Sequence, residues 1–341
     1  MSNTRHHVGI VGAGAWGTAL ACAARRAGSD VLLWAHEADT VAAINESHEN
    51  PTFLPGITLD PAITATTDLA RVGACDLVLL VAPSAHLGAV AARLAAHLAP
   101  GTPVCVCTKG IEAKTGRLMT QVAAAALGRD DLAALSGPSF AAEVAADLPT
   151  AVTVAGPAAT VEAVAAALGG PAFRVYRSDD VAGIEIGGAV KNVIAIACGI
   201  ADGRGLGLNA RAALISRGLA EMVRLGKAMG GRRETQMGLS GLGDLVLTCT
   251  GALSRNYTFG QGLGRGESAD ALMAGRASVV EGAVTAPAVA ELAQRLAVEM
   301  PICAAVNDVL SGKRHVEAAI ADLLARPTGE EFGDPATPGE T

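Results

Sequence analysis

A glycine-rich turn near the amino end constrains the fold of this chain more than any other feature. Residues 7–11 form a short apolar segment typical of a buried strand, the sequence Gly-Ala-Gly-Ala-Trp-Gly follows from residue 12, and residues 18–25 have a helical composition. This order predicts a dinucleotide-binding fold. Gly12 permits the tight turn, Gly14 lets the backbone approach a pyrophosphate, and Gly17 lets the helix pack on the strand. The helix would then direct its free N–H groups at the phosphates.

Strand and helix patterns continue to alternate up to about residue 180. Residues 50–56, with two prolines and a glycine, are typical of an ordered loop. Continuous apolar strands are typical of parallel sheets covered by helices, so we expect an α/β fold with an N-terminal Rossmann-like doubly wound sheet. The expected strands are residues 30–34, 76–82, 102–107, 149–155 and 172–177, with a short one before Gly137, and the expected helices are residues 41–46, 87–98 and 158–168.

Only helical patterns follow Asp180, and they continue to about Leu324. We therefore predict a dinucleotide-binding Rossmann domain at residues 1–180 and an all-helical, substrate-binding C-terminal domain at residues 181–325. The remaining residues, 326–341, are rich in Pro, Gly, Glu and Thr and have little apolar content, which predicts a disordered tail.

An apolar helix at residues 184–202 carries a single lysine, Lys191. Its neighbours at helical spacing are small, Gly187, Gly188 and Cys198 among them, so a backbone segment or a ligand should come close to it. Apolar surroundings disfavour the ammonium form and bring the pKa of a lysine toward the range of proton exchange. The alternative is a lysine that extends to solvent from a buried helix.

A second group of residues is suited to binding an anion. Ser254 lies in an N-cap position before a predicted helix that begins with Arg255 and Asn256. Arginine, asparagine, a serine hydroxyl and free helix N–H groups together indicate a phosphate site.

Hydride transfer to a ketone needs a proton donor at the developing alkoxide, and the reverse reaction needs a base at the hydroxyl. Lys191 is our candidate for that group, and the small residues beside it would leave room for a substrate. Lys109 follows a predicted strand and can add positive charge at the same oxygen. Asp244 lies in a predicted glycine turn between apolar segments. Either Asp244 or Lys109 could tune the amine of Lys191.

Bulk properties exclude several classes of partner. The formal net charge of −7 argues against binding to nucleic acid or to an anionic membrane surface. The longest apolar run, residues 193–200, is shorter than the ~20 residues that a membrane span needs. We expect no signal peptide, no metal site and, with seven scattered cysteines and no Cys-x-x-Cys pair, reduced thiols in the cytoplasm.

Over residues 7 to about 324, the chain resembles the bacterial NAD(P)-dependent sn-glycerol-3-phosphate dehydrogenases. The resemblance implies an oxidoreductase that interconverts dihydroxyacetone phosphate and sn-glycerol 3-phosphate with NAD or NADP and supplies glycerophospholipid synthesis. A homodimer is expected. The motifs that carry the resemblance are the glycine turn, Asn50-Pro-Thr-Phe-Leu-Pro55, Lys109-Gly110, Gly137-Pro-Ser-Phe-Ala141, Val190-Lys-Asn192, Gly243-Asp244-Leu245, Ser254-Arg-Asn256 and Val280-Glu-Gly282.

The resemblance also implies a role for each matched residue, and Lys191 matches the proton acceptor of the family. The implied substrate contacts are Lys109, Gly137, Ser139, Lys191, Asp244, Ser254, Arg255 and Asn256. The implied cofactor contacts, with the three glycines of the turn, are Ala15, Trp16, His36, Phe53, Lys109, Ala141, Arg255, Val279 and Glu281. Ala15, Phe53 and Ala35 stand where the family often has Ser, Tyr and Arg, so the preference between NAD and NADP stays open.

Two other functions fit parts of the pattern. A related two-domain dehydrogenase of a β-hydroxyacid or sugar acid would not need the anion site at Ser254, Arg255 and Asn256. A non-catalytic dinucleotide-binding sensor would need neither Lys191 nor Asp244.

Overall fold

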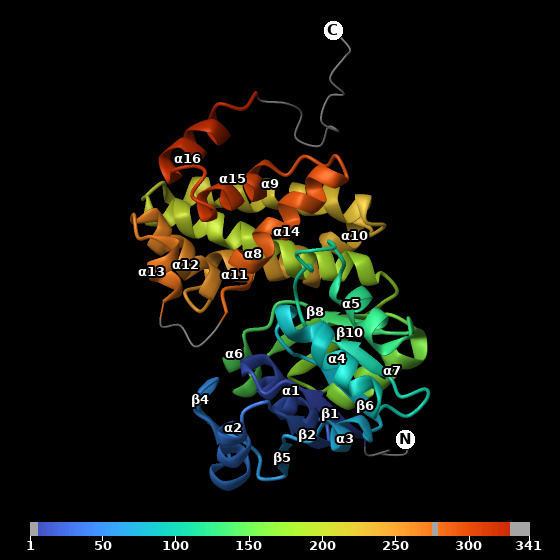
Figure 1. Cartoon of the computed structure of the whole chain (residues 1–341). Coiled ribbons are helices and arrows are strands. Elements are labelled where there is room, and N and C mark those ends of the chain that lie inside the picture. Colours follow the sequence, from blue (N-terminus) through green and yellow to red (C-terminus); the bar gives the residue numbers. More distant parts are fainter. Residues whose placement is uncertain (1–5, 275–278, 328–341) are drawn as a thin grey trace.

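The computed structural model describes residues 6–274 and 279–327. An eight-stranded sheet with helices on both faces forms the first part, and a group of helices forms the second (Figure 1). The predicted α/β fold, a doubly wound sheet followed by helices, is therefore confirmed. The domain boundary at residue 180 stays a prediction, and the predicted tail lies outside the described residues from residue 328 onward.

The strand order of the sheet is β10-β9-β8-β7-β6-β1-β2-β5. All neighbours pair in parallel except β8 and β9, which are antiparallel. The order of the strands along the chain reverses at β1, and Gly12 follows the carboxyl end of that strand. The strands are β1 (His7–Val11), β2 (Asp30–Trp34), β5 (Ile63–Thr66), β6 (Leu77–Leu80), β7 (Val104–Val106), β8 (Ala133–Ser136), β9 (Thr150–Ala155) and β10 (Phe173–Ser178).

Successive side chains of the strands point to opposite faces, and each face has its own buried cluster. In β6, Leu77 and Leu79 join a cluster with α1 and α7, whereas Val78 and Leu80 join a cluster with α3, α4 and α5. The helices of this part are α1 (Ala15–Arg26), α2 (Ala38–Ala42), α3 (Leu69–Gly73), α4 (Leu87–Ala95), α5 (Met119–Leu127), α6 (Ala141–Ala145) and α7 (Ala158–Leu168).

Several local predictions were wrong. No sequence pattern predicted β5, α3 and α5, and the helix expected at residues 41–46 is split into α2 and a π-helical turn at Ala43–Ser47. The expected loop at residues 50–56 is part of a hairpin of β3 (Glu49–Asn50) and β4 (Leu54–Thr58). The two strands of this hairpin share only two residue pairs in an irregular register. Their alternation of apolar and polar side chains is therefore too short to recognise from the sequence.

The helical part is built around α8 (Val181–Gly203), which packs against α9, α11, α12 and α14. Glycines allow a close approach to α12, because a Cβ on Gly199 would lie 2.1 Å from the carbonyl oxygen of Tyr257. The helices are α8, α9 (Gly207–Ala228), α10 (Arg233–Gln236), α11 (Asp244–Thr250), α12 (Arg255–Gly264), α13 (Ala269–Met273), α14 (Glu281–Arg295), α15 (Pro301–Leu310) and α16 (Val316–Leu324).

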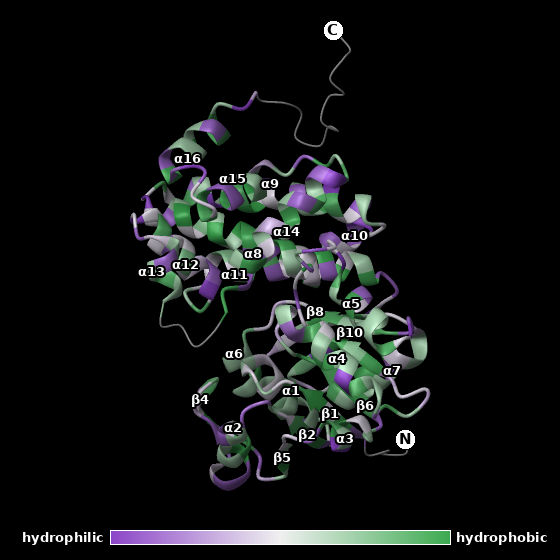
Figure 2. Cartoon of the chain, in the orientation of Figure 1, coloured by the Kyte–Doolittle hydropathy of each residue, from purple (hydrophilic) through white to green (hydrophobic). Residues whose placement is uncertain are grey.

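α8 is more apolar than the sequence analysis assumed (Figure 2). Among the described residues it is the one helix long and apolar enough to cross a membrane. The apolar segment is therefore longer than the run of residues 193–200 noted in the sequence. Its whole apolar window is buried by the surrounding protein, which is typical of a core helix. All seven cysteines are free, as expected.

Candidate active site

One buried carboxylate between two lysines forms the centre of the candidate site. Asp244, the first residue of α11, is 0% exposed. Lys191 of α8 donates from Nζ to Asp244 Oδ1 at 2.5 Å, and Lys109, beyond β7, donates to Oδ2 at 2.7 Å. Asp244 therefore joins a lysine of the sheet part to a lysine of the helical part.

Thr248 completes the surroundings of the Lys191 amine. Its hydroxyl accepts a hydrogen bond from Lys191 Nζ at 2.9 Å and donates to the carbonyl oxygen of Asp244 at 2.6 Å. Since the hydroxyl proton is already used, the oxygen presents lone pairs to the amine. The amine is thus fixed by two acceptors on successive turns of α11.

The glycine turn predicted around Asp244 was wrong. Residues Leu239–Gly243 form a π-helical turn that continues directly into α11. Gly241 serves close packing there, because a Cβ on it would lie 2.0 Å from the carbonyl oxygen of Gln236. Gly241 therefore reflects contact with α10, and the chain continues as helix rather than breaking between apolar segments.

The small residues before Lys191 also serve close packing. A Cβ on Gly187 would lie 2.4 Å from the carbonyl oxygen of Ser240, and one on Gly188 would lie 2.6 Å from Ser136 Oγ. The expectation that these glycines leave room for a substrate was wrong, because protein atoms occupy that space. The alternative of a lysine that extends to solvent is also wrong, since Lys191 is only 7% exposed.

The environment of Lys191 prepares its amine for proton exchange. Burial lowers the pKa of Lys191 from its ordinary 10.5 to about 8, because the ammonium form is poorly solvated there. The negative charge of Asp244 raises this pKa and the positive charge of Lys109 lowers it, with Asp244 having the larger effect of the two. An arginine in this place could not release a proton near neutral pH.

The loop after β8 holds Lys109 from the sheet side. Lys109 Nζ donates to the carbonyl oxygen of Gly137 at 3.1 Å, and Ser139 Oγ donates to the same oxygen at 2.9 Å. The carboxyl ends of β7 and β8 thus bring three of the predicted substrate contacts together. Phe140 extends this loop toward α11, where a Cβ on Gly251 would lie 3.2 Å from its ring.

The start of α12 forms a second cluster. Ser254 caps the helix as predicted, since its Oγ accepts from the N–H of Tyr257 at 3.2 Å. The side chain of Asn256 is engaged within the protein: it donates to Asn192 Oδ1 at 2.8 Å and accepts from the N–H of Gly282 at 2.9 Å. Its amide therefore fixes α12 to α8 and α14, and Arg255 is the exposed member of the predicted anion site.

The glycine turn has the expected geometry. Gly12 has φ +124°, which side chains rarely adopt, and a Cβ on it would lie 2.9 Å from the carbonyl carbon of Val81. A Cβ on Gly17 would lie 1.8 Å from the carbonyl oxygen of Gly12. By contrast, a Cβ on Gly14 would meet nothing within 4 Å. Gly12 and Gly17 are thus required by the turn itself, whereas Gly14 borders open space at the start of α1.

The β3–β4 hairpin is tied to this turn through Asn50. Asn50 Nδ2 donates to the carbonyl oxygen of Ala13 and to Thr18 Oγ1, both at 2.8 Å. Asn50 Oδ1 accepts from the N–H of Phe53 at 3.3 Å. The predicted cofactor contact Phe53 is therefore held beside the glycine turn by a residue to which we had assigned no role.

Three predicted cofactor contacts gather around the start of α1. Ala15, Trp16 and Ala141 all pack against the buried cluster on the α1 face of the sheet. The indole Nε1 of Trp16 is buried and has no hydrogen-bond partner among the described residues. His36 lies beyond the end of β2, where it is exposed, with its ring 6.3 Å from that of Trp34.

The remaining predicted cofactor contacts lie in the helical part. Glu281, the first residue of α14, accepts a hydrogen bond from Ser84 Oγ at 3.0 Å. Burial raises the pKa of Glu281, whereas the hydrogen bond from Ser84 and the charge of Arg255 lower it. Arg255 and Glu281 are thus near each other. Val279, two residues before Glu281 in the chain, is exposed.

Two family models match the chain. The model described as NAD-dependent glycerol-3-phosphate dehydrogenase N-terminus matches residues 7–161, and the model of the C-terminus matches residues 180–321. The chain belongs to the NAD-dependent glycerol-3-phosphate dehydrogenase family. The resemblance recognised from the sequence motifs is thereby confirmed.

Relatives named glycerol-3-phosphate dehydrogenase NAD(P)+ are similar to the chain over nearly their whole length. The protein of Caulobacter vibrioides is 54% identical over 96% of this chain and 99% of its own length. That of Rhodospirillum rubrum is 53% identical over 98% of this chain and 96% of its own. A glycerol-3-phosphate dehydrogenase structure from Coxiella burnetii is 42% identical, with a TM-score of 0.90 over 94% of this chain and 99% of that chain.

Four residues that support the candidate active site had no role predicted from the sequence: Thr248, Asn192, Asn50 and Ser84. Thr248 lies four residues after Asp244, so a helical reading of residues 244–250 would have placed both on one face. Asn192 and Asn50 occur within the family motifs that we quoted, but without an assigned role. No sequence pattern pointed to Ser84, because its partner Glu281 is 197 positions away.

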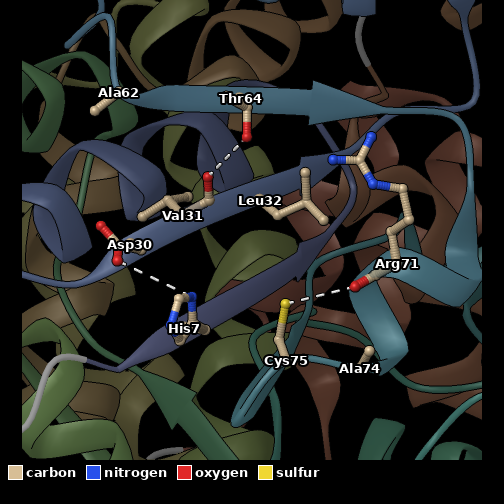
Figure 3. Close-up of a pocket in the computed structure, with 9 residues that line it drawn as sticks. All are labelled: His7, Asp30, Val31, Leu32, Ala62, Thr64, Arg71, Ala74 and Cys75. Carbon is tan, nitrogen blue, oxygen red and sulfur yellow. Dashed lines mark hydrogen bonds and ion pairs between the residues drawn. The ribbon is translucent and has the colours of Figure 1, made fainter.

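A hollow of about 490 Å³ lies at the opposite end of the strands (Figure 3). His7 and Asp30, the first residues of β1 and β2, line it together with Arg71 and Cys75. The dehydrogenase-family site lies at the carboxyl ends of these strands, so the hollow is separate from it. Within the described ranges, no group of three or more His, Cys, Asp or Glu side chains could hold a metal ion.

Proposed function

We propose that this chain catalyses the reversible NAD(P)H-dependent reduction of dihydroxyacetone phosphate to sn-glycerol 3-phosphate and so supplies glycerophospholipid synthesis. The observation that carries the proposal is the buried Lys191 amine, held at 2.5 Å from Asp244 beside Lys109. A dinucleotide-type glycine turn lies on the sheet side of this group, and the capped start of α12 lies on the helical side.

The residues around the glycine turn fit a dinucleotide. Open space beyond Gly14 and the free N–H groups at the start of α1 suit a pyrophosphate. Ala15, Trp16, Phe53 and Ala141 would line this end of the cofactor site, and His36 would lie at its adenosine end. When bound, the nicotinamide supplies or accepts the hydride.

Lys191 would hold and transfer the proton at the substrate oxygen. In the reducing direction its ammonium form donates a proton to the oxygen of the new alcohol, and in the oxidising direction its neutral form accepts one. Lys109 would stabilise negative charge on the same oxygen. Asp244 would keep both amines in place, since each of its oxygens accepts from one of them.

The phosphate group of the substrate would bind at the start of α12. Arg255 is exposed there, and Ser254 and Asn256 shape the first turn around free N–H groups. Gly137 and Ser139 would contact the substrate from the loop after β8. Arg255, Val279 and Glu281 would also contact the cofactor. The charge of Arg255 lowers the pKa of Glu281, so these two side chains lie close enough to act at the same end of the site.

Initial rates with purified protein test the proposal. We expect oxidation of NADH or NADPH in the presence of dihydroxyacetone phosphate, and the ratio of the two rates gives the cofactor preference. Turnover of a β-hydroxyacid or sugar acid without turnover of dihydroxyacetone phosphate would favour the related dehydrogenase. Cofactor binding without any turnover would favour a sensor.

Gly14→Ala should leave the fold intact and weaken cofactor binding. The added methyl group meets no protein atom within 4 Å, and φ at Gly14 is −66°, which any residue adopts. The same methyl group would occupy the space proposed for the pyrophosphate. Titration of NADH fluorescence should show a higher Kd at an unchanged Tm. An unchanged Kd would contradict the placement of the cofactor.

Arg255→Ala should chiefly raise the KM for dihydroxyacetone phosphate. Loss of a charge-assisted contact to phosphate typically costs about 1.5–3 kcal/mol, or roughly a 10- to 100-fold higher KM. At saturating NADH, unphosphorylated dihydroxyacetone, as a poor substrate, should be used equally well by the wild type and the variant. Exposed Arg265, on the carboxyl side of α12, provides the control variant Arg265→Ala. A normal KM in Arg255→Ala would reject the phosphate role.

We further propose a homodimer in the cytoplasm. Large apolar side chains are exposed at the junction of α8 and α9, where Leu208 is 68% and Leu206 is 45% exposed, and such side chains are favoured at protein interfaces. Light scattering after gel filtration should give about twice the monomer mass. A monomer mass at micromolar concentration would reject the dimer.

A further inference from the structure

The loop between β7 and α5 is the place where the sheet part enters the helical part. Ile111 and Leu118, each 3% exposed, belong to the buried cluster that contains Val289 and Leu292 of α14, and not to either cluster of the sheet. The two residues pair in an antiparallel bridge. In Figure 1 the segment that leads into α5 rises from the sheet to the helices.

This loop is closed on itself and packed against α14. The N–H of Glu112 donates to the carbonyl oxygen of Arg117 at 2.9 Å, and the N–H of Gly116 donates to that of Glu112 at 2.8 Å. A Cβ on Gly116 would lie 3.2 Å from Leu292 Cδ1 and 2.3 Å from Arg295 Nη2. Gly116 is therefore packed against α14 with no room for a side chain.

Both ends of the loop are fixed to the helical part as well. Gly110, with φ +148°, lies beside Ser84 of the sheet part and Thr285 of α14, whose side-chain atoms would lie 3.1 and 3.8 Å from a Cβ at that position. Beyond Leu118, Glu185 of α8 accepts hydrogen bonds from the N–H of Thr120 at 2.9 Å and from its hydroxyl. The chain on the carboxyl side of Lys109 is thus anchored to α14 and α8.

We propose that Ile111 and Leu118 are positioning residues for Lys109, an inference that rests on the proposed function. A lysine side chain has many rotamers, so its ammonium keeps one place only if the backbone that carries it is fixed. The strand β7 fixes that backbone on one side, and the burial of Ile111 in the helical core fixes it on the other. Lys109 Nζ is thereby kept 2.7 Å from Asp244, a residue of the opposite part.

Displacement of Lys109 would change the charge around Lys191. The ionisable groups that face Lys191 are Asp244 and Cys249 of α11 and Lys109, and of these only Lys109 lowers its pKa. When Lys109 leaves its place, the ammonium form of Lys191 should persist to higher pH. The alkaline limit of ketone reduction should then move upward, an effect that general destabilisation does not produce.

The test compares Ile111→Ala with Ile302→Ala in the full chain. Ile302 of α15 is 5% exposed and belongs to the same buried cluster, so both variants should lose similar thermal stability. Only Ile111→Ala should lower kcat for dihydroxyacetone phosphate reduction, by roughly 10- to 100-fold, as expected for a displaced catalytic group. Only this variant should raise the alkaline midpoint of the pH profile.

The conservative change Ile111→Val should retain kcat and the midpoint. If Ile111→Ala does not fold, Leu118→Val is compared with Ile302→Val. A higher alkaline midpoint of the pH profile in Leu118→Val alone would then support the positioning role. Equal kcat and equal midpoints in the loop and control variants would overturn the positioning role while wild-type turnover upholds the proposed function. Absence of turnover in the wild type would overturn both.

Discussion

Lys191→Ala is expected to fold and to bind cofactor but to lose kcat by ~10²–10⁴-fold or more, the usual contribution of positioned proton transfer. Lys191 is 7% exposed and its amine is fixed by Asp244 and Thr248, so water cannot take its place as an equally oriented donor. Lys109 still pairs with Asp244 in this variant, so the buried carboxylate keeps one ion-pair partner. Single-turnover kinetics with a bound dinucleotide would separate the chemical step from binding.

Two comparisons sharpen this result. Lys191→Arg keeps the positive charge but cannot release a proton near neutral pH, so it should also be inactive if proton transfer is the role. Added ethylamine should partly restore Lys191→Ala, because it can enter the vacated space and carry a proton. Lys227→Ala, at an exposed position of α9, is the matched control. Near-normal kcat in Lys191→Ala would reject the assignment.

Asp244→Asn should be the second most damaging change, because it removes one negative charge from between two ammonium groups. Breaking a buried ion pair in this way typically costs about 3–5 kcal/mol in the free energy of unfolding. The loss should appear as a lower midpoint in urea unfolding. Asp179→Asn, which removes an exposed ion pair with Arg232, should cost far less.

The same substitution should shift the pH profile in a defined direction. In the wild type, ketone reduction needs the ammonium form of Lys191 and should decline as the pH rises through about 8, whereas alcohol oxidation should increase there. Asp244 raises the pKa of Lys191, so Asp244→Asn should lower both midpoints. Profiles of kcat from pH 6 to 10 in both directions would measure this. A midpoint that stays in place or rises would contradict the tuning role of Asp244.

Much of the fold could be predicted because its signals are local. The strand, glycine turn and helix at residues 7–25 are contiguous, and the steric demands of Gly12 and Gly17 involve neighbours in the same turn. The change from alternating elements to helices only at residue 180 is equally visible in sequence. Short elements such as β5 and the β3–β4 hairpin were missed, because strands of two to five residues carry too little periodicity.

The family motifs likewise named the residues of the candidate site, whose roles stay a prediction, but not how these residues contact one another. Glycines near Lys191 and Asp244 suggested space for a ligand and a turn, whereas each contacts a backbone or side-chain atom of another element. A glycine in a sequence shows that something approaches closely, and only the tertiary structure shows what that is. The engagement of the Asn256 side chain with Asn192 and Gly282 is a further instance.

The sequence by itself therefore determined the dinucleotide fold, the family and the lysine on which the proposed chemistry depends. These follow from patterns within about 20 adjacent residues or from ordered motifs. Only the tertiary structure decided that Asp244 bridges Lys109 and Lys191, across 135 and 53 positions of the chain. It also decided that Ile111 and Leu118, in the loop after Lys109, are buried in the helical core. Such contacts depend on how elements that are distant in the sequence pack together, and no local sequence pattern encodes that packing.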